Sequence, residues 1–198
     1  MPFARRGSSR STRRRAETRS QRGPVAYRIA KAALNRPLRA AYQVDVQGLE
    51  NVPADEGVIL AANHRSFMDS IFLALASPEP VAFVAKAEYF ENPMTRWLFR
   101  ATGQIPLKRG SPAGAREALA AATGAAIVPV GLVGTDQVQL PEERLPHLFR
   151  PVAVRFGAAR RLPAPDGKAS ARRLRATTDE VMQDIAALSG AEYVDSFA

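Results

Sequence analysis

Short apolar runs alternate with longer segments of helical periodicity along this chain, and that alternation restricts the fold more than any other feature of the sequence. Residues 42–47 alternate apolar and polar side chains, which predicts a strand with one buried face. Residues 57–62, Gly-Val-Ile-Leu-Ala-Ala, form an apolar run between loops, as in a fully buried strand. Strands are predicted at 42–48, 57–62, 81–85, 104–107, 126–130 and 152–156, and helices at 24–41, 69–77, 92–102, 112–122 and 170–188. This order predicts an α/β fold, a mixed sheet flanked by helices.

Charge divides the chain into unequal parts. Lys and Arg number 28 against 19 Asp and Glu, a net charge of +9. Residues 1–23 hold eight of those bases, all Arg, and one acid, so this segment carries +7 and the rest carries +2. We predict a disordered Arg-rich arm at 1–23, a basic amphipathic helix at 24–41 that is kinked at Pro37, and one globular domain at 42–198.

Composition excludes several kinds of site. Cysteine is absent and only two histidines are present, so we expect no disulfide framework, no Cys nucleophile and no metal centre. No run approaches the roughly 18 apolar residues of a membrane span, and no apolar segment follows the basic start as in a secretory signal. An Arg-rich, acid-poor start is also typical of organelle transit peptides, and that alternative stays open.

A histidine and an aspartate follow the second predicted strand, in the segment Asn63-His64-Arg65-Ser66-Phe67-Met68-Asp69. On one continuous helix His64 and Asp69 would lie about 140° apart and could not pair. With His64 in a turn and Asp69 in the first helical turn, the carboxylate can reach the imidazole and fix its tautomer. The other ring nitrogen is then available to take a proton from a hydroxyl. The alternative, a histidine that only caps a loop, stays open on these residues alone.

Two further segments add to this pair. Residues 103–109, Gly-Gln-Ile-Pro-Leu-Lys-Arg, end a predicted strand with two bases, which suits phosphate binding. Residues 127–131, Ile-Val-Pro-Val-Gly, form a buried strand interrupted by a proline. With residues 63–69, these segments resemble the first, second and fourth sequence blocks of the glycerolipid acyltransferases of the 1-acylglycerol-3-phosphate acyltransferase type. The resemblance covers about residues 40–160.

The resemblance implies transfer of an acyl group from acyl-CoA or acyl carrier protein to a lysophospholipid hydroxyl, with no other cofactor. It implies that His64 is the general base and Asp69 its partner. The implied substrate-binding residues are Arg109, Lys108, Gly103, Asn63, Ser66 and Pro129, of which Asn63 and Ser66 can equally be turn formers that orient the histidine.

One block of the family is missing. The third block, a strand that ends in Pro-Glu-Gly-Thr-Arg, has no counterpart here, and only 19 residues separate Arg109 from Pro129. A further strand and helix would need roughly 30 more residues, so we expect the sheet to lack one strand-helix unit. Residues 142–144, Glu-Glu-Arg, are interpreted as a solvated loop. His147 has no spaced carboxylate partner in the sequence and is expected to be inert.

The basic segment suggests where the protein acts. Arginines bind anionic lipid headgroups or nucleic acid, and residues 24–41 would add apolar burial at a membrane. We expect an anionic membrane surface to bind residues 1–41 and the protein to be cytoplasmic and peripheral on the inner face of the cell membrane. Nucleic-acid binding is a weaker alternative, since the arm lacks interleaved aromatic residues. A third reading is a catalytically impaired, membrane-docking remnant of the family.

Overall fold

The structure, a computed structural model, describes residues 25–107, 125–140, 143, 145–161 and 167–192. The chain divides into two compact units. The smaller contains the chain up to Leu34 together with Ser77–Leu107, and the larger contains Asn35–Ala76 together with Lys108–Ala198.

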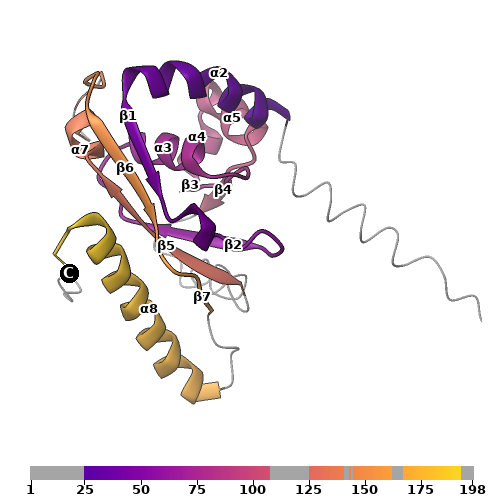
Figure 1. The fold of residues 1–198 in the computed structure, drawn as a ribbon. Helices are drawn as coiled ribbons and strands as arrows, with labels where there is room; N and C mark the ends of the chain where they lie inside the picture. Colours follow the sequence, from indigo (N-terminus) through magenta and orange to yellow (C-terminus); the bar gives the residue numbers. More distant parts are fainter. Residues whose placement is uncertain (1–24, 108–124, 141–142, 144, 162–166, 193–198) are drawn as a thin grey trace, which may run out of the picture. The chain divides into compact units, whose positions relative to one another are not determined.

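The larger unit is built on a five-stranded mixed sheet (Figure 1). Its strands are β1 (Gln43–Gln47), β2 (Val58–Ala62), β5 (Ala126–Val133), β6 (Pro151–Phe156) and β7 (Arg160–Arg161). The order is β1-β6-β5-β2, and β7 also pairs with β5. The pairs β1–β6 and β2–β5 are parallel, whereas β5 runs antiparallel to β6 and β7. The predicted mixed sheet flanked by helices is therefore confirmed.

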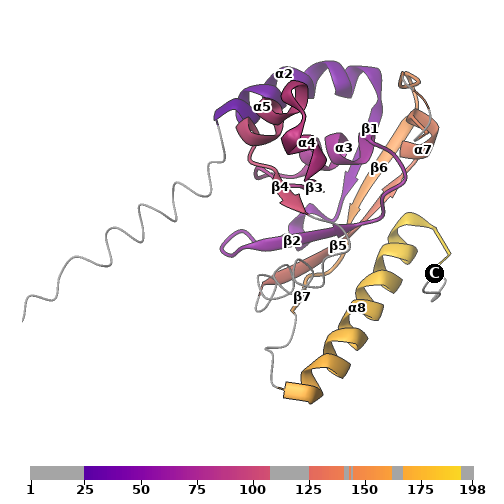
Figure 2. The ribbon, with the colours of Figure 1, turned by 180° about the vertical axis from the view of Figure 1, so that it is seen from behind.

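Strand β5 is the centre of this unit, because nearly all of its residues are buried. Val128 and Val130 are fully buried on one of its faces. On the other face, Ile127 packs with Val181 and Ile185 of α8 (Gly167–Ser189). Figure 2, the view from behind, shows α8 alongside β5 and β7. Burial of both faces explains why residues 126–130 form an unbroken apolar run in the sequence.

Helix α3 (Met68–Ala76) packs on the sheet face away from α8 (Figure 1). Phe72 of α3 is fully buried and meets Tyr42 edge to face, with ring centroids 5.2 Å apart. Tyr42 lies between β1 and the end of α2 (Val25–Ala41), where its backbone N–H donates to the Leu38 carbonyl. This contact fixes α3, and with it the turn that precedes α3, against the sheet.

Pro129 lies in the middle of β5, where a proline removes one donor from the ladder. The antiparallel register shifts by one residue at this position: Val130 faces Phe156, but Ile127 faces Arg160. The sheet therefore has a bulge opposite the proline, and the Gly157 N–H donates to the Pro129 carbonyl at 2.8 Å. The missing donor falls where the ladder is already interrupted.

The smaller unit contains a separate two-stranded parallel sheet, β3 (Val84–Lys86) with β4 (Ile105–Leu107). Two helices, α4 (Glu88–Glu91) and α5 (Pro93–Ala101), connect them, and Phe99 of α5 stacks on Tyr89 of α4. Tyr27, near the start of α2, is buried here and its hydroxyl accepts a hydrogen bond from the Val81 N–H. That burial raises the pKa of the Tyr27 phenol.

Most predicted elements are present, with shifted ends. Strand β5 extends three residues beyond the predicted end at 130, and α8 begins before the predicted start at 170. The sequence did not indicate that β3 and β4 would pair with each other in a second sheet. The sequence did not indicate α4, α7 (Thr135–Val138), β7 or the 3-10 turn Leu49–Asn51, because four or fewer residues carry no periodicity. The helix predicted at 112–122 and the arm at 1–23 lie outside the described residues.

Gly131 in β5 gives a direct test of how closely α8 approaches the sheet. A Cβ at this position would lie 2.5 Å from the carbonyl carbon of Leu188, a backbone atom that cannot move aside cheaply. We expect Gly131→Ala to lower the free energy of unfolding by about 1–3 kcal/mol in urea titrations. Gly57→Ala is the matched control, because nothing lies within 4 Å of its Cβ. Equal stabilities of the two variants would contradict the close packing of α8.

Candidate active site

The turn between β2 and α3 brings together the predicted catalytic pair. β2 ends at Ala62 and α3 begins at Met68, so His64 lies in the turn and Asp69 in the first turn of the helix. His64 Nδ1 lies 2.9 Å from Asp69 Oδ2. The His64 side chain is 67% exposed, whereas the Asp69 side chain is only 3% exposed. The ring is therefore fixed at one nitrogen and open to solvent elsewhere.

A single oxygen of Asp69 organises the turn. Besides the imidazole, Oδ2 accepts the backbone N–H of Arg65 at 2.7 Å and of Ser66 at 2.8 Å. Hydrogen bonds to an ionised acceptor are the stronger kind, and these are shielded from water by burial. The other oxygen, Oδ1, is buried and has no hydrogen-bond partner among the described residues. Asp69 thus shapes the loop that carries His64 as well as orienting the ring.

Asn63 joins this turn to the centre of the sheet. Its side-chain Nδ2 donates to the Leu132 carbonyl at 2.8 Å, and its Oδ1 accepts the Leu132 N–H at 2.7 Å. The backbone ladder between β2 and β5 ends at Ala62 opposite Val130. The Asn63 amide therefore continues the pairing with its side chain while its backbone turns toward His64. This is the orienting role that the sequence left open for Asn63.

Ser66 and Arg65 complete the turn. Ser66 is 2% exposed, and its hydroxyl accepts the Met68 N–H at 3.2 Å, which caps the start of α3. Arg65 Nη2 lies 3.4 Å from Asp136 Oδ2 on α7, the short helix after β5. The sequence did not indicate this ion pair, since the two residues lie on different elements. Substrate contact by Asn63 and Ser66 stays a prediction.

The remaining predicted binding residues lie outside the His64 turn. Gly103, in the smaller unit, has a φ of 74° and ends α5: its N–H donates to the Arg100 carbonyl and that of Gln104 to the Phe99 carbonyl. This pair of bonds is the Schellman arrangement, which favours glycine. Pro129 is fully buried in β5. Lys108 and Arg109 lie outside the described residues. The binding roles of all four stay predictions.

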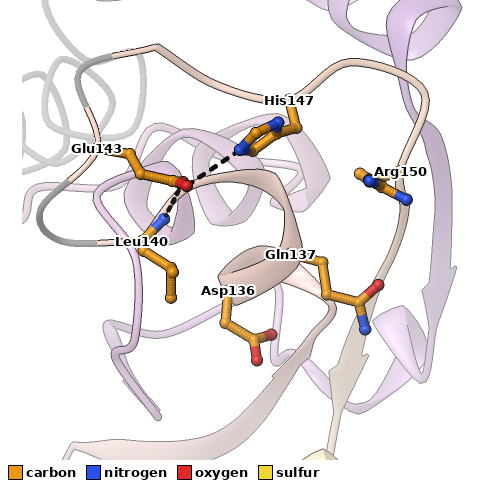
Figure 3. Close-up of a pocket in the computed structure, with 6 residues that line it drawn as sticks. All are labelled: Asp136, Gln137, Leu140, Glu143, His147 and Arg150. Carbon is orange, nitrogen blue, oxygen red and sulfur yellow. Dashed lines mark hydrogen bonds and ion pairs between the residues drawn. The ribbon is translucent and has the colours of Figure 1, made fainter.

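A depression of about 300 Å³ lies between α7 and the loop that follows it (Figure 3). Its lining residues are Asp136, Gln137, Leu140, Glu143, His147 and Arg150. The Glu143 carboxylate accepts the Leu140 N–H at 2.9 Å and lies 3.1 Å from His147 Nε2. The expectation that His147 has no carboxylate partner is therefore wrong. Its partner, Glu143, precedes it by four residues and is partly exposed, whereas residues 142 and 144 lie outside the described residues.

No group of three or more possible metal ligands occurs in the part of the chain that the structure describes. The chemistry that this arrangement can perform is proton transfer: an imidazole held at Nδ1 by a buried carboxylate, with Nε2 available to an incoming hydroxyl.

Comparison with known proteins matches residues 43–132 to the family model called Acyltransferase. The chain is 35% identical over 85 residues to the chloroplastic 1-acyl-sn-glycerol-3-phosphate acyltransferase BAT2 of Brassica napus, covering 42% of this chain and 24% of that protein. It is 39% identical over 59 residues to the 1-acyl-sn-glycerol-3-phosphate acyltransferase of Streptococcus pneumoniae, covering 29% and 22%. The chain thus spans about a quarter of the length of these relatives.

Among solved structures, the chain is similar to PlsC, the 1-acyl-sn-glycerophosphate acyltransferase of Thermotoga maritima. The TM-score is 0.54 at 25% sequence identity, over 77% of this chain and 74% of that one. The family match includes β1, β2, α3 and all but the last residue of β5, and hence the turn that carries His64 and Asp69.

Glu143 predicts a pH dependence of the loop after α7. The hydrogen bond from the Leu140 N–H, followed by that with His147, lowers the pKa of this carboxyl from its ordinary 4.5. Stability from these contacts is therefore complete above the pKa of the unfolded chain, and is lost as pH falls through the lower folded-state pKa. We expect the Leu140 and His147 amide resonances to shift over that acidic range. Glu143→Gln should abolish the shift, and an unchanged titration in this variant would contradict the assignment.

Proposed function

We propose that this chain belongs to the glycerolipid acyltransferases, and that it transfers an acyl group from a thioester to the free hydroxyl of a lysophospholipid such as lysophosphatidate. The donor is acyl-CoA or acyl carrier protein. The relatives that carry this activity in their names support the proposal, and the His64–Asp69 contact of 2.9 Å is the observation that carries it.

In the proposed reaction, His64 acts as general base. Its Nδ1–H donates to Asp69, which leaves the Nε2 lone pair for the acceptor hydroxyl. As Nε2 takes the proton, the hydroxyl oxygen attacks the thioester carbonyl carbon. The tetrahedral intermediate then collapses, the C–S bond breaks, and the leaving thiolate takes the proton back from the imidazolium.

Asp69 supports both stages of this cycle. Its charge faces the imidazolium that forms when His64 takes the proton. Three donors hold Oδ2, so the carboxylate does not need to reorganise during the reaction. The Asn63 amide fixes the same loop to Leu132, which keeps the imidazole in place while the two substrates bind.

The phosphate of the acceptor lipid needs a cationic side chain to bind it. As the resemblance implies, Arg109 and Lys108 contact the phosphate of the acceptor, and Gly103 belongs to the same binding segment. The acyl donor binds near the strand that contains Pro129. The proposal thus assigns residues to the binding of both the acceptor and the acyl donor.

Two substitutions test the catalytic pair. His64→Ala should lower the rate of acyl transfer from acyl-CoA to lysophosphatidate by about 10²- to 10⁴-fold, because the general base is lost. Asp69→Asn keeps an oxygen acceptor for the turn but removes the charge, so we expect a large loss of rate with the fold retained. His147→Ala, at the other histidine of the chain, is the matched control. Equal rates for the wild type and His64→Ala would refute the mechanism.

We further propose that the protein acts at the cytoplasmic face of the cell membrane and docks there through residues 1–41. No helix in the described part of the chain has the length and apolar character needed to cross a bilayer. Helix α2 buries Tyr27 but exposes Val25 and Ile29, one turn apart, at 68% and 64%. Arg28 and Arg36 are also exposed on it. This helix thus combines exposed apolar and cationic side chains, as interfacial helices do.

Removing residues 1–23 tests the electrostatic part of docking. The segment carries +7, and each base contributes about 1 kcal/mol near an anionic surface. We expect the truncated chain to bind anionic vesicles more weakly in sedimentation assays, with a weaker dependence on salt. Ile29→Ser should reduce binding at all salt concentrations, since it removes apolar burial. Unchanged binding in both variants would exclude this segment.

The impaired remnant remains a second candidate because of the short spacing between Arg109 and Pro129. It predicts vesicle binding with no turnover by the wild-type chain. Any turnover that depends on His64 excludes it.

A further inference from the structure

The loop between α7 and β6 exposes three large apolar side chains within five residues. Leu145 is 79% exposed, Leu148 54% and Phe149 76%. Single exposed apolar residues are ordinary on protein surfaces, but a cluster of this kind marks an interaction site. The proposed catalytic pair and the docking helix do not account for it.

This loop is held in place by the rest of the larger unit. The His147 N–H donates to the Val138 carbonyl at 2.7 Å, and the Phe149 N–H donates to the Ala41 carbonyl at 2.9 Å. His147 is also paired with Glu143. The apolar side chains are therefore presented to solvent by a fixed backbone.

Phe149 has a φ of 60°, and it is the one non-glycine residue with positive φ in the described part of the chain. That conformation is unfavourable for a bulky side chain and is readily adopted by glycine or asparagine. The backbone here would suit a small turn residue, yet it carries an exposed aromatic ring. The ring is thus unfavourable for the loop itself and buries little of its surface in return.

Exposed arginines lie near this apolar cluster. Arg150, next to Phe149, is exposed. The Phe149–Ala41 bond places the loop at the end of α2, where Arg36 and Arg39 are exposed. Residues 145–150 contain no acid. Apolar side chains bordered by cations match the boundary between acyl chains and headgroups of an anionic bilayer.

We propose that residues 145–150 form a second membrane anchor, in which Leu145, Leu148 and Phe149 enter the bilayer interface and Arg150 meets the lipid phosphates. This inference rests on the proposed function, which places the acceptor lipid in a membrane. Arg65 of the His64 turn pairs with Asp136 of α7, the helix that precedes this loop. The anchor would therefore hold the catalytic turn close to the lipid surface.

A tryptophan probe tests the anchor directly. The only tryptophan, Trp97, is replaced by Phe, and Phe149→Trp is introduced; Met182→Trp, at an exposed position of α8, is the control. With anionic vesicles of brominated phospholipid, emission from position 149 should shift to the blue and be quenched, and that from 182 should not. A bound protein whose position 149 is not quenched overturns the anchor but leaves membrane docking intact. Absence of any vesicle binding overturns both.

A second variant separates anchoring from folding. Leu148→Ser with Phe149→Asn keeps a residue that tolerates positive φ, so the thermal midpoint should not fall. Vesicle partitioning should weaken by about tenfold for each large apolar side chain removed. Acyl transfer in detergent micelles should be unchanged, and Met182→Ser is the control for loss of an exposed apolar group. Unchanged partitioning of the double variant would overturn the proposal. A blue shift of the tryptophan at position 149 that needs no lipid and grows with protein concentration would also overturn it, and would indicate self-association instead.

Discussion

The arrangement around His64 depends on one carboxylate oxygen. Asp69 Oδ2 receives the imidazole and two backbone N–H groups, and it does so from a position almost completely shielded from water. A donor lost from such a site would leave a buried charge poorly compensated, so the turn and the helix that follows it form or fail together. The same bonds that shape the backbone orient the imidazole ring.

The position of the His64 turn depends on the sheet to which it is bonded. The Asn63 amide makes two hydrogen bonds with Leu132 near the end of β5, and α8 covers one face of β5. At Gly131 the backbone of the helix approaches so closely that a methyl group has no room. Two ion pairs from Arg160 to Glu180 and Asp184 tie the same helix to β7. Packing on the far face of the sheet thus stabilises the strand to which the His64 turn is fixed.

The sequence predicted those parts of the fold that show a regular apolar pattern or are bounded by turn-forming residues. The alternation at 42–47 and the apolar runs at 57–62 and 126–130 predicted β1, β2 and β5, and the spacing from His64 to Asp69 predicted their contact. Periodicity could not identify which strands pair, so it missed the separate β3–β4 sheet. The contacts from Asn63 to Leu132 and from Arg65 to Asp136 could not be predicted from the sequence either, because their partners lie about 70 residues further along the chain. The Glu143–His147 pair had a local signal, a spacing of four residues, which sequence reasoning overlooked.

The order of strands also has a consequence for synthesis of the chain. Among the described residues, β1 pairs only with β6, whose first residue is Pro151, and β2 pairs only with β5, which begins at Ala126. At ribosomal rates of about 5–20 residues per second, the first strand therefore waits roughly 5–20 s for its partner. During that interval its backbone groups are an unpaired edge, open to pairing with other chains. The nascent protein thus passes through a stage in which chaperones, or an early encounter with a membrane surface, would decide how much of it reaches the folded state.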